Sequence, residues 1–347
     1  MSFTKILIQW YLHNKRDLPW RKTQDPYAIW LSEIILQQTR VAQGMPYFFA
    51  FLDTFPTVFD LANASEQQVL KLWQGLGYYS RAQNLHKTAQ YIASDLNGVF
   101  PNNYNDLLTL KGVGEYTAAA IASFCYNEPV PVVDGNVFRV LSRYYDIETD
   151  IASNGAKKEF KALAYEIMPF DNPAIFNQAL MEFGALQCVP KSPNCPVCVM
   201  NDSCVALQKK KVDMLPVKLK KTLVRDRFLN YIIFIDEDNH TQIQQRTAKG
   251  IWHNLYEFPL IETEKAESED FIEDKINEQF SAVFDLKTIT LINTGNVNHK
   301  LSHQNLNIKF WNVEIKGKIE KGINYDALIT YPFPIVLYNF IEKQWPQ

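Results

Sequence analysis

The stretch that decides the fold is LKGVGEYTAAA, residues 110–120, in which two glycines separate two helical segments. The preceding NDLLTL has the apolar spacing of a helix, and so does EYTAAAIASFCY, which begins within the stretch. Because glycine has no Cβ, Gly112 and Gly114 allow a tight turn that presents backbone N–H groups at the positive end of the second helix. Such a turn can bind a phosphate of a nucleic-acid backbone. The alternative is an ordinary corner between two helices.

Helical patterns continue on both sides of this turn, from the N-terminus to about residue 208. The segment 25–41, DPYAIWLSEIILQQTRV, predicts a helix with Asp25 as its N-cap and Pro26 in its first turn. Residues 64–96 predict two helices that are hinged at Gly75 and Gly77.

The pattern of residue types in the chain changes after Arg227. FLNYIIFID and NLNIKFWNVEI have the β-branched and aromatic content of strands, and residues 268–284 between them predict one amphipathic helix. The fold class is therefore multidomain, an all-α domain followed by an α+β domain. We place the helical domain at 1–208, a basic linker at 209–227 and the α+β domain at 228–347.

Composition and charge limit the kinds of protein that this chain can be. Its 347 residues are 47% hydrophobic, which supports packed cores and argues against disorder. No apolar run has the length of a membrane span, and no signal-peptide pattern begins the chain, so we expect an intracellular protein without a membrane partner. The net charge of −3 hides a local +6 at 209–227 and −6 at 262–278. The basic linker predicts contact with phosphates, with a solvated connector as the alternative.

Four of the five cysteines lie within 17 residues and have the spacing C-x6-C-x2-C-x5-C. They are Cys188, Cys195, Cys198 and Cys204. Four thiolates can bind either a structural zinc ion or a 4Fe–4S cluster. Paired C-x2-C motifs are the more usual zinc pattern and only one is present, so the spacing favours the cluster. Cys125, in an alanine-rich helix, is interpreted as a core residue.

Two carboxylates have surroundings that suggest chemistry. Glu33 is the only acidic residue between Asp25 and Asp53, and its helix is strongly apolar, so desolvation should raise its pKa and keep it protonated. Asp134 precedes a predicted helix, where an N-cap position and the helix dipole favour the charged form. Cleavage of a glycosidic bond uses such a pair, one acid and one anion. The alternatives are a solvated glutamate and a simple helix cap.

Several motifs together resemble the MutY family of DNA glycosylases, within the endonuclease III-like helix-hairpin-helix superfamily. They are DLPWR, SEIILQQTRV, GLGYYSRAQNL, LKGVGEYT, VDGNVFRVLSR, the four closely spaced cysteines, LPVK and EFP. The resemblance covers nearly the whole chain. It implies a helix-hairpin-helix glycosylase domain with a six-helix part at about 23–133 and an iron–sulfur part formed by 1–22 and 134–208. It also implies a 4Fe–4S cluster held by the four cysteines.

The resemblance further implies a monomeric, cytoplasmic base excision repair enzyme that acts on duplex DNA. It would flip out and excise adenine paired with 8-oxoguanine or guanine. Glu33 would protonate adenine and then activate water, and Asp134 would stabilise the sugar cation, with Tyr116 and Asn136 in support. Tyr116 stands where bifunctional relatives carry a lysine nucleophile, so the enzyme would be monofunctional. The DNA-binding residues implied by the family are Arg21, Gln38, Thr39, Tyr78, Gly112 and Gly114.

In the α+β domain, GIWHNLYEFPL resembles a MutT-like fold of the Nudix type. The chain lacks the ordered Gly, Glu and Arg-Glu box that pyrophosphate hydrolysis needs, which argues against that activity. The family uses this domain to recognise 8-oxoguanine through a Phe-Ser-His motif. Ser302 and His303 match it, but Leu301 replaces the phenylalanine.

Three other functions remain as alternatives. One is a glycosylase of the endonuclease III type for oxidised pyrimidines or mismatched thymine, which Tyr116 and the MutT-like domain disfavour. Another is a non-catalytic protein that binds damaged DNA, which the presence of both Glu33 and Asp134 disfavours. The third is a nucleotide pyrophosphatase, which the missing metal box disfavours.

Overall fold

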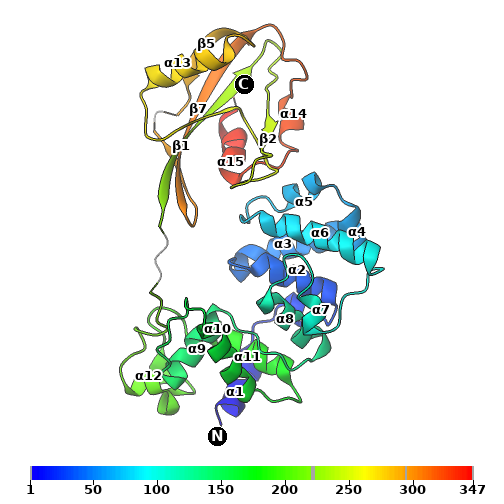
Figure 1. Cartoon of the computed structure of the whole chain (residues 1–347), viewed down its shortest axis with the longest axis vertical. Coiled ribbons are helices and arrows are strands. Elements are labelled where there is room, and N and C mark those ends of the chain that lie inside the picture. Colours follow the sequence, from blue (N-terminus) through cyan, green and yellow to red (C-terminus); the bar gives the residue numbers. More distant parts are fainter. Residues whose placement is uncertain (1, 220–222, 294, 346–347) are drawn as a thin grey trace. The chain divides into compact units, whose positions relative to one another are not determined.

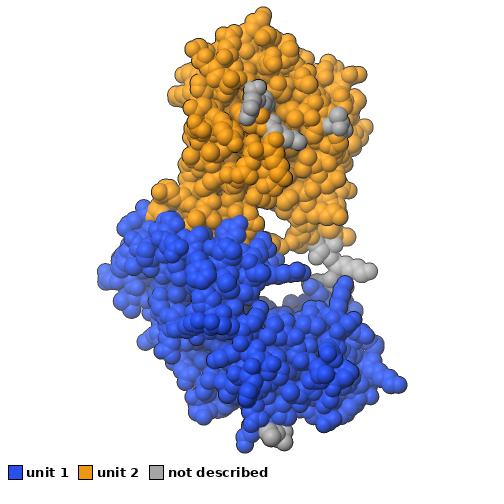
Figure 2. Space-filling view, turned by 180° about the vertical axis from the view of Figure 1, so that it is seen from behind, with its two compact units in different colours: residues 1–63, 84–220 blue, residues 64–83, 221–347 orange. Residues whose placement is uncertain are grey.

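The computed structural model describes residues 2–219, 223–293 and 295–345 (Figure 1). The chain forms two compact units, one of residues 1–63 and 84–220 and one of residues 64–83 and 221–347 (Figure 2). The second unit thus includes a short segment from the helical part of the sequence. Residues 220–222 of the predicted basic linker lie outside the described residues. The domain limits at 208 and 228 stay predictions.

The first unit is helical, as the sequence predicts (Figure 1). Its α-helices before the glycine turn are α1 (Phe3–Asn14), α2 (Pro26–Leu36), α3 (Val41–Thr54), α4 (Val58–Asn63), most of α6 (Ser80–Asp95) and α7 (Tyr104–Leu107). After the turn come α8 (Glu115–Tyr126), α9 (Gly135–Tyr145), α10 (Ala156–Glu166), α11 (Pro173–Leu186) and α12 (Val205–Gln208). Short 3-10 helices lie at η1 (Pro19–Arg21), η2 (Cys195–Val197) and η3 (Asn201–Ser203). None of the described helices is long and apolar enough to span a bilayer.

Helix α2 starts where the sequence predicts and ends earlier. The Asp25 carboxylate accepts hydrogen bonds from the backbone N–H groups of Tyr27 and Ala28, at 3.1 and 3.2 Å, and so caps the helix. The predicted helix to residue 41 is wrong at its C-terminal end, because Gln37 leaves the helical region with a ψ of 116° and Gln38 follows with a left-handed φ of +55°.

The glycine turn between α7 and α8 forms as predicted. Gly112 has a φ of +76°, and a Cβ there would lie 2.6 Å from the Cβ of Asn84, so both the conformation and the space demand glycine. Gly114 is the N-cap residue of α8, and no atom lies within 4 Å of the position that a Cβ would take there. The turn therefore leaves the N-terminus of α8 accessible to a ligand.

One hydrophobic cluster forms the core around α9 and α11. Phe160, Phe176, Val137 and Leu141 are fully buried there, together with Leu7 of α1. Helix α1 therefore packs against helices more than 120 residues away in the sequence, which joins the N-terminal segment to the cysteine-bearing part of the unit.

The second unit is built on a mixed sheet with the order β4-β1-β7-β5, in which β6 also pairs with β7. The paired strands are β1 (Arg225–Ile235), β4 (Leu260–Thr263), β5 (Asp285–Leu291), β6 (Val297–Lys300) and β7 (Gln304–Lys316). Strands β1 and β7 run parallel, and the other pairs are antiparallel. A separate pair is formed by β2 (Gln244–Gln245) and β3 (Tyr256–Glu257).

Helices cover both faces of this sheet. Helix α13 (Glu269–Phe280) buries Ile272 and Ile276 against Phe234 and Trp311, which share one face. On the opposite face, Phe340 of α15 (Ile335–Gln344) stacks on Phe310 with ring centres 3.8 Å apart. The short helix α14 (Tyr325–Leu328) precedes α15. The predicted α+β domain is thus confirmed.

The segment 64–83 completes the second unit. Helix α5 (Glu66–Leu72) begins with a capping box of Ser65 and Gln68, and the chain then turns through Gly75 and Gly77, whose φ angles are +100° and +72°. The predicted hinge between two helices is confirmed. Tyr78 follows with a φ of +47°, directly before α6.

Candidate active site and nucleic-acid interface

One pocket of the first unit joins three of the predicted catalytic residues. Glu33 reaches it from α2, Tyr116 from the first turn of α8, and Asp134 from the N-cap of α9. The remaining lining residues are Leu36, Gln37, Gln38, Gly114, Glu115, Thr117, Val133, Gly135, Phe138 and Lys157. Residues that are about 100 positions apart in the sequence therefore converge on one cavity.

Glu33 lies in a setting that favours the protonated acid. Its side chain is 6% exposed, and burial raises its pKa to about 7, with the charge of Asp134 adding to the rise. A hydrogen bond from Tyr116 and the positive charge of Arg21 act in the opposite direction. A carboxyl with its pKa raised into this range can carry a proton near neutral pH, which suits a general acid.

Tyr116 donates its hydroxyl hydrogen to the Glu33 carboxylate. Burial and the two neighbouring carboxylates raise the pKa of Tyr116 well above its ordinary value, so the phenol stays protonated and remains a donor. This side chain has no amine and cannot form an imine with a sugar. It can hold Glu33 in place.

Asp134 caps α9 as the sequence predicts. Its Oδ1 accepts a 2.8 Å hydrogen bond from the Val137 backbone N–H, and its Oδ2 accepts a 2.7 Å hydrogen bond from the Asn136 amide. These bonds favour the charged form. Burial of the carboxyl nevertheless outweighs them and raises the pKa of Asp134, which the sequence argument from the helix cap did not include.

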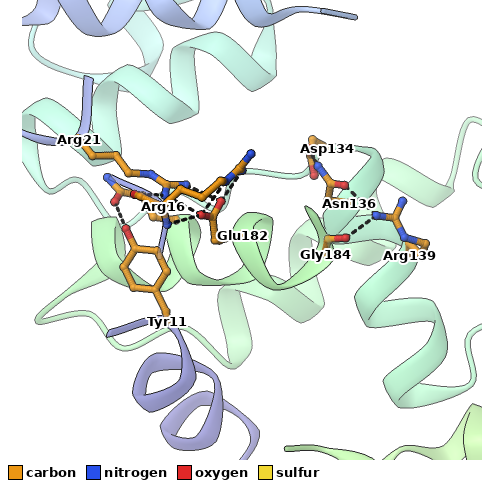
Figure 3. A network of polar contacts seen from close by, with 9 residues as sticks. Tyr11, Arg16, Arg21, Asp134, Asn136, Arg139, Glu182 and Gly184 are labelled. Atoms are coloured by element: carbon orange, nitrogen blue, oxygen red, sulfur yellow. Dashed lines mark hydrogen bonds and ion pairs between the residues drawn. The ribbon is translucent and has the colours of Figure 1, made fainter. Parts of the chain in front are cut away.

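Hydrogen bonds through Asn136 and Arg139 link Asp134 to the segment that carries the cysteines, and Figure 3 shows them as far as Gly184. Arg139 donates from Nη2 to the Asn136 side-chain oxygen at 2.7 Å and to the Gly184 carbonyl at 2.8 Å. Its Nε donates to the Cys188 carbonyl at 2.7 Å. A Cβ on Gly184 would lie 2.6 Å from the Cβ of Asn136, so glycine at that position allows the close approach. Asn136 thus positions Asp134 and is itself positioned by Arg139.

The four predicted metal-binding cysteines line a second pocket of the first unit. Arg143, only 2% exposed, also lines it and donates from Nη1 to the Cys188 sulfur at 3.4 Å. A buried cation beside thiolates offsets their negative charge. No three His, Cys, Asp or Glu residues in the described ranges are grouped to hold a single metal ion, although the four thiols surround one cavity. Four thiols around one cavity suit a metal centre, either a structural zinc ion or a 4Fe–4S cluster.

Arg21 lies close enough to Glu33 for its positive charge to lower the pKa of that carboxyl, but it is not among the residues that line the active pocket. Its Nη1 and Nη2 donate to the two carboxylate oxygens of Glu182 at 2.9 and 2.8 Å (Figure 3). Arg16 donates to the same carboxylate. Burial would raise the pKa of Glu182, but the hydrogen bonds from Arg16 and Arg21 outweigh it and lower the pKa to about 2. Both Nη atoms of Arg21 are therefore bound by a buried partner, Glu182, that no sequence motif indicates.

The other predicted DNA-binding residues fall into two groups. Gln38 lines the active pocket with its backbone in the left-handed region, and the Thr39 hydroxyl donates to the Gln37 carbonyl at 3.3 Å. Gly112 and Gly114 form the turn before α8. These four belong to the first unit, whereas Tyr78, Ser302 and His303 belong to the second.

In the second unit, Ser302 and His303 form the tip of the β6–β7 hairpin, which Leu301 and Gln304 close with a 2.7 Å backbone hydrogen bond. Both are exposed. The Tyr78 and Ser302 hydroxyls share a short hydrogen bond. Tyr78 is 48% exposed and its neighbour Tyr79 is buried, so core packing accounts for Tyr79 alone.

The structure also reveals site residues that the sequence did not indicate. Lys157, the second residue of α10, is the cation among the described residues that line the active pocket. Gln37 lines the pocket too and donates to the Thr117 hydroxyl at 3.1 Å, which ties α2 to α8. Lys157 belongs to no motif, and Gln37 lies within SEIILQQTRV without a role of its own, so only the fold shows that both residues lie beside the carboxylates.

Comparison with known families matches both units. Residues 31–165 match the HhH-GPD superfamily of base excision DNA repair proteins, and residues 230–343 match the NUDIX domain. An adenine DNA glycosylase of Buchnera aphidicola from Schizaphis graminum is 36% identical over 276 residues, which cover 79% of each chain. The human adenine DNA glycosylase is 41% identical over 217 residues, which cover 60% of this chain and 40% of the human one.

Solved structures agree with these matches. A thermostable thymine-DNA glycosylase aligns with a TM-score of 0.56 and 30% identity, covering 60% of this chain and 95% of that one. Endonuclease III in a non-covalent DNA complex aligns with a TM-score of 0.53 at 20% identity, covering 60% and 99%, which shows a shared fold. With a relative 36% identical over four fifths of its length and both domain models matched, the chain belongs to the adenine DNA glycosylase family of the HhH-GPD superfamily.

Proposed function

We propose that this chain binds duplex DNA, flips out adenine that is paired with 8-oxoguanine or guanine, and hydrolyses the bond between adenine and its sugar. The observation that carries the proposal is the convergence of Glu33, Tyr116 and Asp134 on one pocket, with a Glu33 pKa of about 7. The family membership supports adenine as the base removed. Extrusion of the base is needed because the pocket acts on a bond that stacking and pairing bury in the duplex.

The two carboxylates divide the chemistry. Protonated Glu33 donates its proton to adenine, which makes the base a better leaving group and leaves a cationic sugar. Charged Asp134 stabilises that cation. Glu33, now ionised, accepts a proton from the attacking water, so one residue serves as acid and then as base. Tyr116 holds Glu33 in place, and Asn136 holds Asp134.

The central test compares three duplexes, with adenine opposite 8-oxoguanine, adenine opposite thymine, and thymine opposite guanine. Alkali then cleaves the strand wherever a base has been removed. We expect cleavage of the first duplex, little of the second, and none of the third. Preferential cleavage of the thymine–guanine duplex would instead assign the chain the specificity named for its thymine-DNA glycosylase neighbour. An intact first duplex would refute the proposal.

Lys157 is proposed to bind a phosphate beside the flipped nucleotide. The active pocket holds several acidic groups that repel DNA, and Lys161, a cation beside the pocket residue Glu115, is paired with that residue at 2.8 Å. We expect Lys157→Ala to weaken binding of a duplex that carries an uncleavable adenosine analogue, and to reduce the slope of log affinity against log salt by about 1. The neighbouring Lys158 does not line the pocket, so Lys158→Ala is the matched control. Equal slopes for the two variants would contradict the assignment.

The four cysteines, Cys188, Cys195, Cys198 and Cys204, are proposed to hold a 4Fe–4S cluster with a structural role, which the lining of their shared pocket supports. When bound, the cluster would fix the loop to which Arg139 and Arg143 donate. Purified protein should contain about four irons per chain, and Cys198→Ser should lose iron while Cys125→Ser keeps it. Stoichiometric zinc in a colourless protein would refute this assignment.

The β6–β7 hairpin is proposed to read the base opposite adenine through Ser302 and His303, which lie exposed at its tip. With Leu301 in the aromatic position, hydrogen bonds at these residues carry the selectivity. We expect Ser302→Ala combined with His303→Ala to reduce the preference for 8-oxoguanine over guanine by about tenfold. Single-turnover rates on the two duplexes give this preference. An unchanged ratio would remove the hairpin from recognition.

A further inference from the structure

Tyr78 lies on a segment that groups with the sheet unit, although the flanking helices belong to the first unit. Residues 64–83 form α5, the glycine turn and the start of α6. The hydrogen bond between the hydroxyls of Tyr78 and Ser302 joins the tip of this segment to the tip of the β6–β7 hairpin. A single exposed hydrogen bond cannot by itself fix the position of a turn, because water competes for both hydroxyls. The anchor must lie elsewhere along the segment.

Lys71 and Gln74 supply the half-buried part of that anchor. The Lys71 ammonium lies 4.1 Å from the ring centre of Tyr338 in α15 and donates to the Tyr331 carbonyl at 3.4 Å. It also donates to Gln74 Oε1 at 3.3 Å, and the same oxygen accepts a 3.2 Å hydrogen bond from the Phe333 backbone N–H. These contacts link α5 to the chain between α14 and α15. Burial lowers the pKa of Lys71 to about 8, in keeping with its place in an interface.

Further polar contacts extend the same junction on either side. The Asn254 amide donates to the Glu66 carboxylate at 3.1 and 3.2 Å, and the Gln83 amide donates to the His253 carbonyl at 2.7 Å. Both partners lie in the loop before β3, so the segment is held at its two ends as well as in its middle. The turn with Tyr78 is therefore presented in a fixed position next to Ser302.

We propose that Lys71 and Gln74 are positioning residues for recognition of the base opposite adenine. They fasten the segment that carries Tyr78 to the sheet unit, so that Tyr78 and Ser302 meet the opposite base as one preformed surface. This inference rests on the proposed function. A surface that is already ordered loses less conformational entropy when it binds DNA. A base that fits the ordered surface is then bound in preference to one that does not.

The experiment replaces Lys71 with Met, which keeps an unbranched side chain that is one atom shorter and removes the charge. Two measurements are made on the full chain: the ratio of single-turnover rates on adenine opposite 8-oxoguanine and opposite guanine at subsaturating enzyme, and backbone hydrogen exchange of residues 66–83 without DNA. We expect the ratio to fall about tenfold and exchange of the segment to rise. The rate on adenine opposite 8-oxoguanine at saturating enzyme should change less than about twofold, because the catalytic residues are untouched.

Two further variants make the result specific. Lys71→Arg keeps a cation over the Tyr338 ring and should restore both the ratio and the protection from exchange. Lys87→Met changes an exposed lysine on α6 and should alter neither. A wild-type ratio in Lys71→Met, or a loss of protection spread over the whole chain, would overturn the inference. If wild type fails to cleave adenine opposite 8-oxoguanine, the proposed function fails, and hydrogen exchange still decides whether Lys71 anchors the segment.

Discussion

Glu33→Gln is expected to slow adenine excision by about 10² to 10⁴-fold in single-turnover experiments. Glutamine has the shape of glutamate and can still accept the hydrogen bond from Tyr116, but it has no acidic proton to give to the base. The substitution also removes a buried ionisable group, so the free energy of unfolding should not fall. Binding to an uncleavable duplex should persist. The loss then belongs to the chemical step.

The pH dependence of the single-turnover rate is a second test of the role of Glu33. Since Glu33 acts in its protonated form and its pKa is about 7, the reactive fraction decreases as the pH rises through 7. The single-turnover rate should therefore fall about tenfold per pH unit above that value, and Glu33→Gln should lose this alkaline limb. Glu159→Gln, at an exposed position of α10, is the control. A wild-type rate in Glu33→Gln, or a profile that is flat up to pH 9, would remove Glu33 from the role of acid.

The setting of Glu33 could be predicted because it is mostly local. Its apolar helix neighbours are adjacent in the sequence and predict a buried helix, and the burial of Glu33 itself is the largest cause of its raised pKa. The capped start of α2 and the glycine turn before α8 are likewise set by short-range rules on N-caps and positive φ. The end of α2 at Leu36 could not be predicted, because the non-helical ψ of Gln37 and the left-handed φ of Gln38 follow from no local signal of that kind.

Contacts between residues that are far apart in the sequence could not be predicted. Arg139 meets Gly184 and Cys188 across 45 and 49 residues, and Arg21 meets Glu182 across 161. No periodicity in the chain encodes such pairs. The same holds for residues 64–83, whose helical pattern is plain but whose contacts with the sheet unit depend on Lys71 and Gln74. The balance at Asp134, where burial outweighs three hydrogen bonds, also needed the folded surroundings.

Asp134→Asn is expected to slow excision by about 10² to 10³-fold, a loss of roughly 3 to 4 kcal/mol of transition-state stabilisation. Asparagine is as good an N-cap as aspartate, so α9 should keep its start and the midpoint of thermal unfolding should change little. What disappears is the negative charge that faces the sugar cation. Asp25→Asn is a matched control, because Asp25 also caps a helix with its carboxylate but lies outside the pocket.

The paired result separates electrostatic catalysis from helix capping. If the charge of Asp134 acts on the cation, Asp134→Asn loses rate and Asp25→Asn does not, while both keep their thermal midpoints within a few degrees. Since the hydrogen bond from Asn136 favours the charged form, Asn136→Ala should move the acid limb of the rate profile toward higher pH as the pKa of Asp134 rises further. Equal rates in the two capping variants would show that Asp134 only builds α9, and the stabilising anion would then have to come from ionised Glu33 after proton transfer.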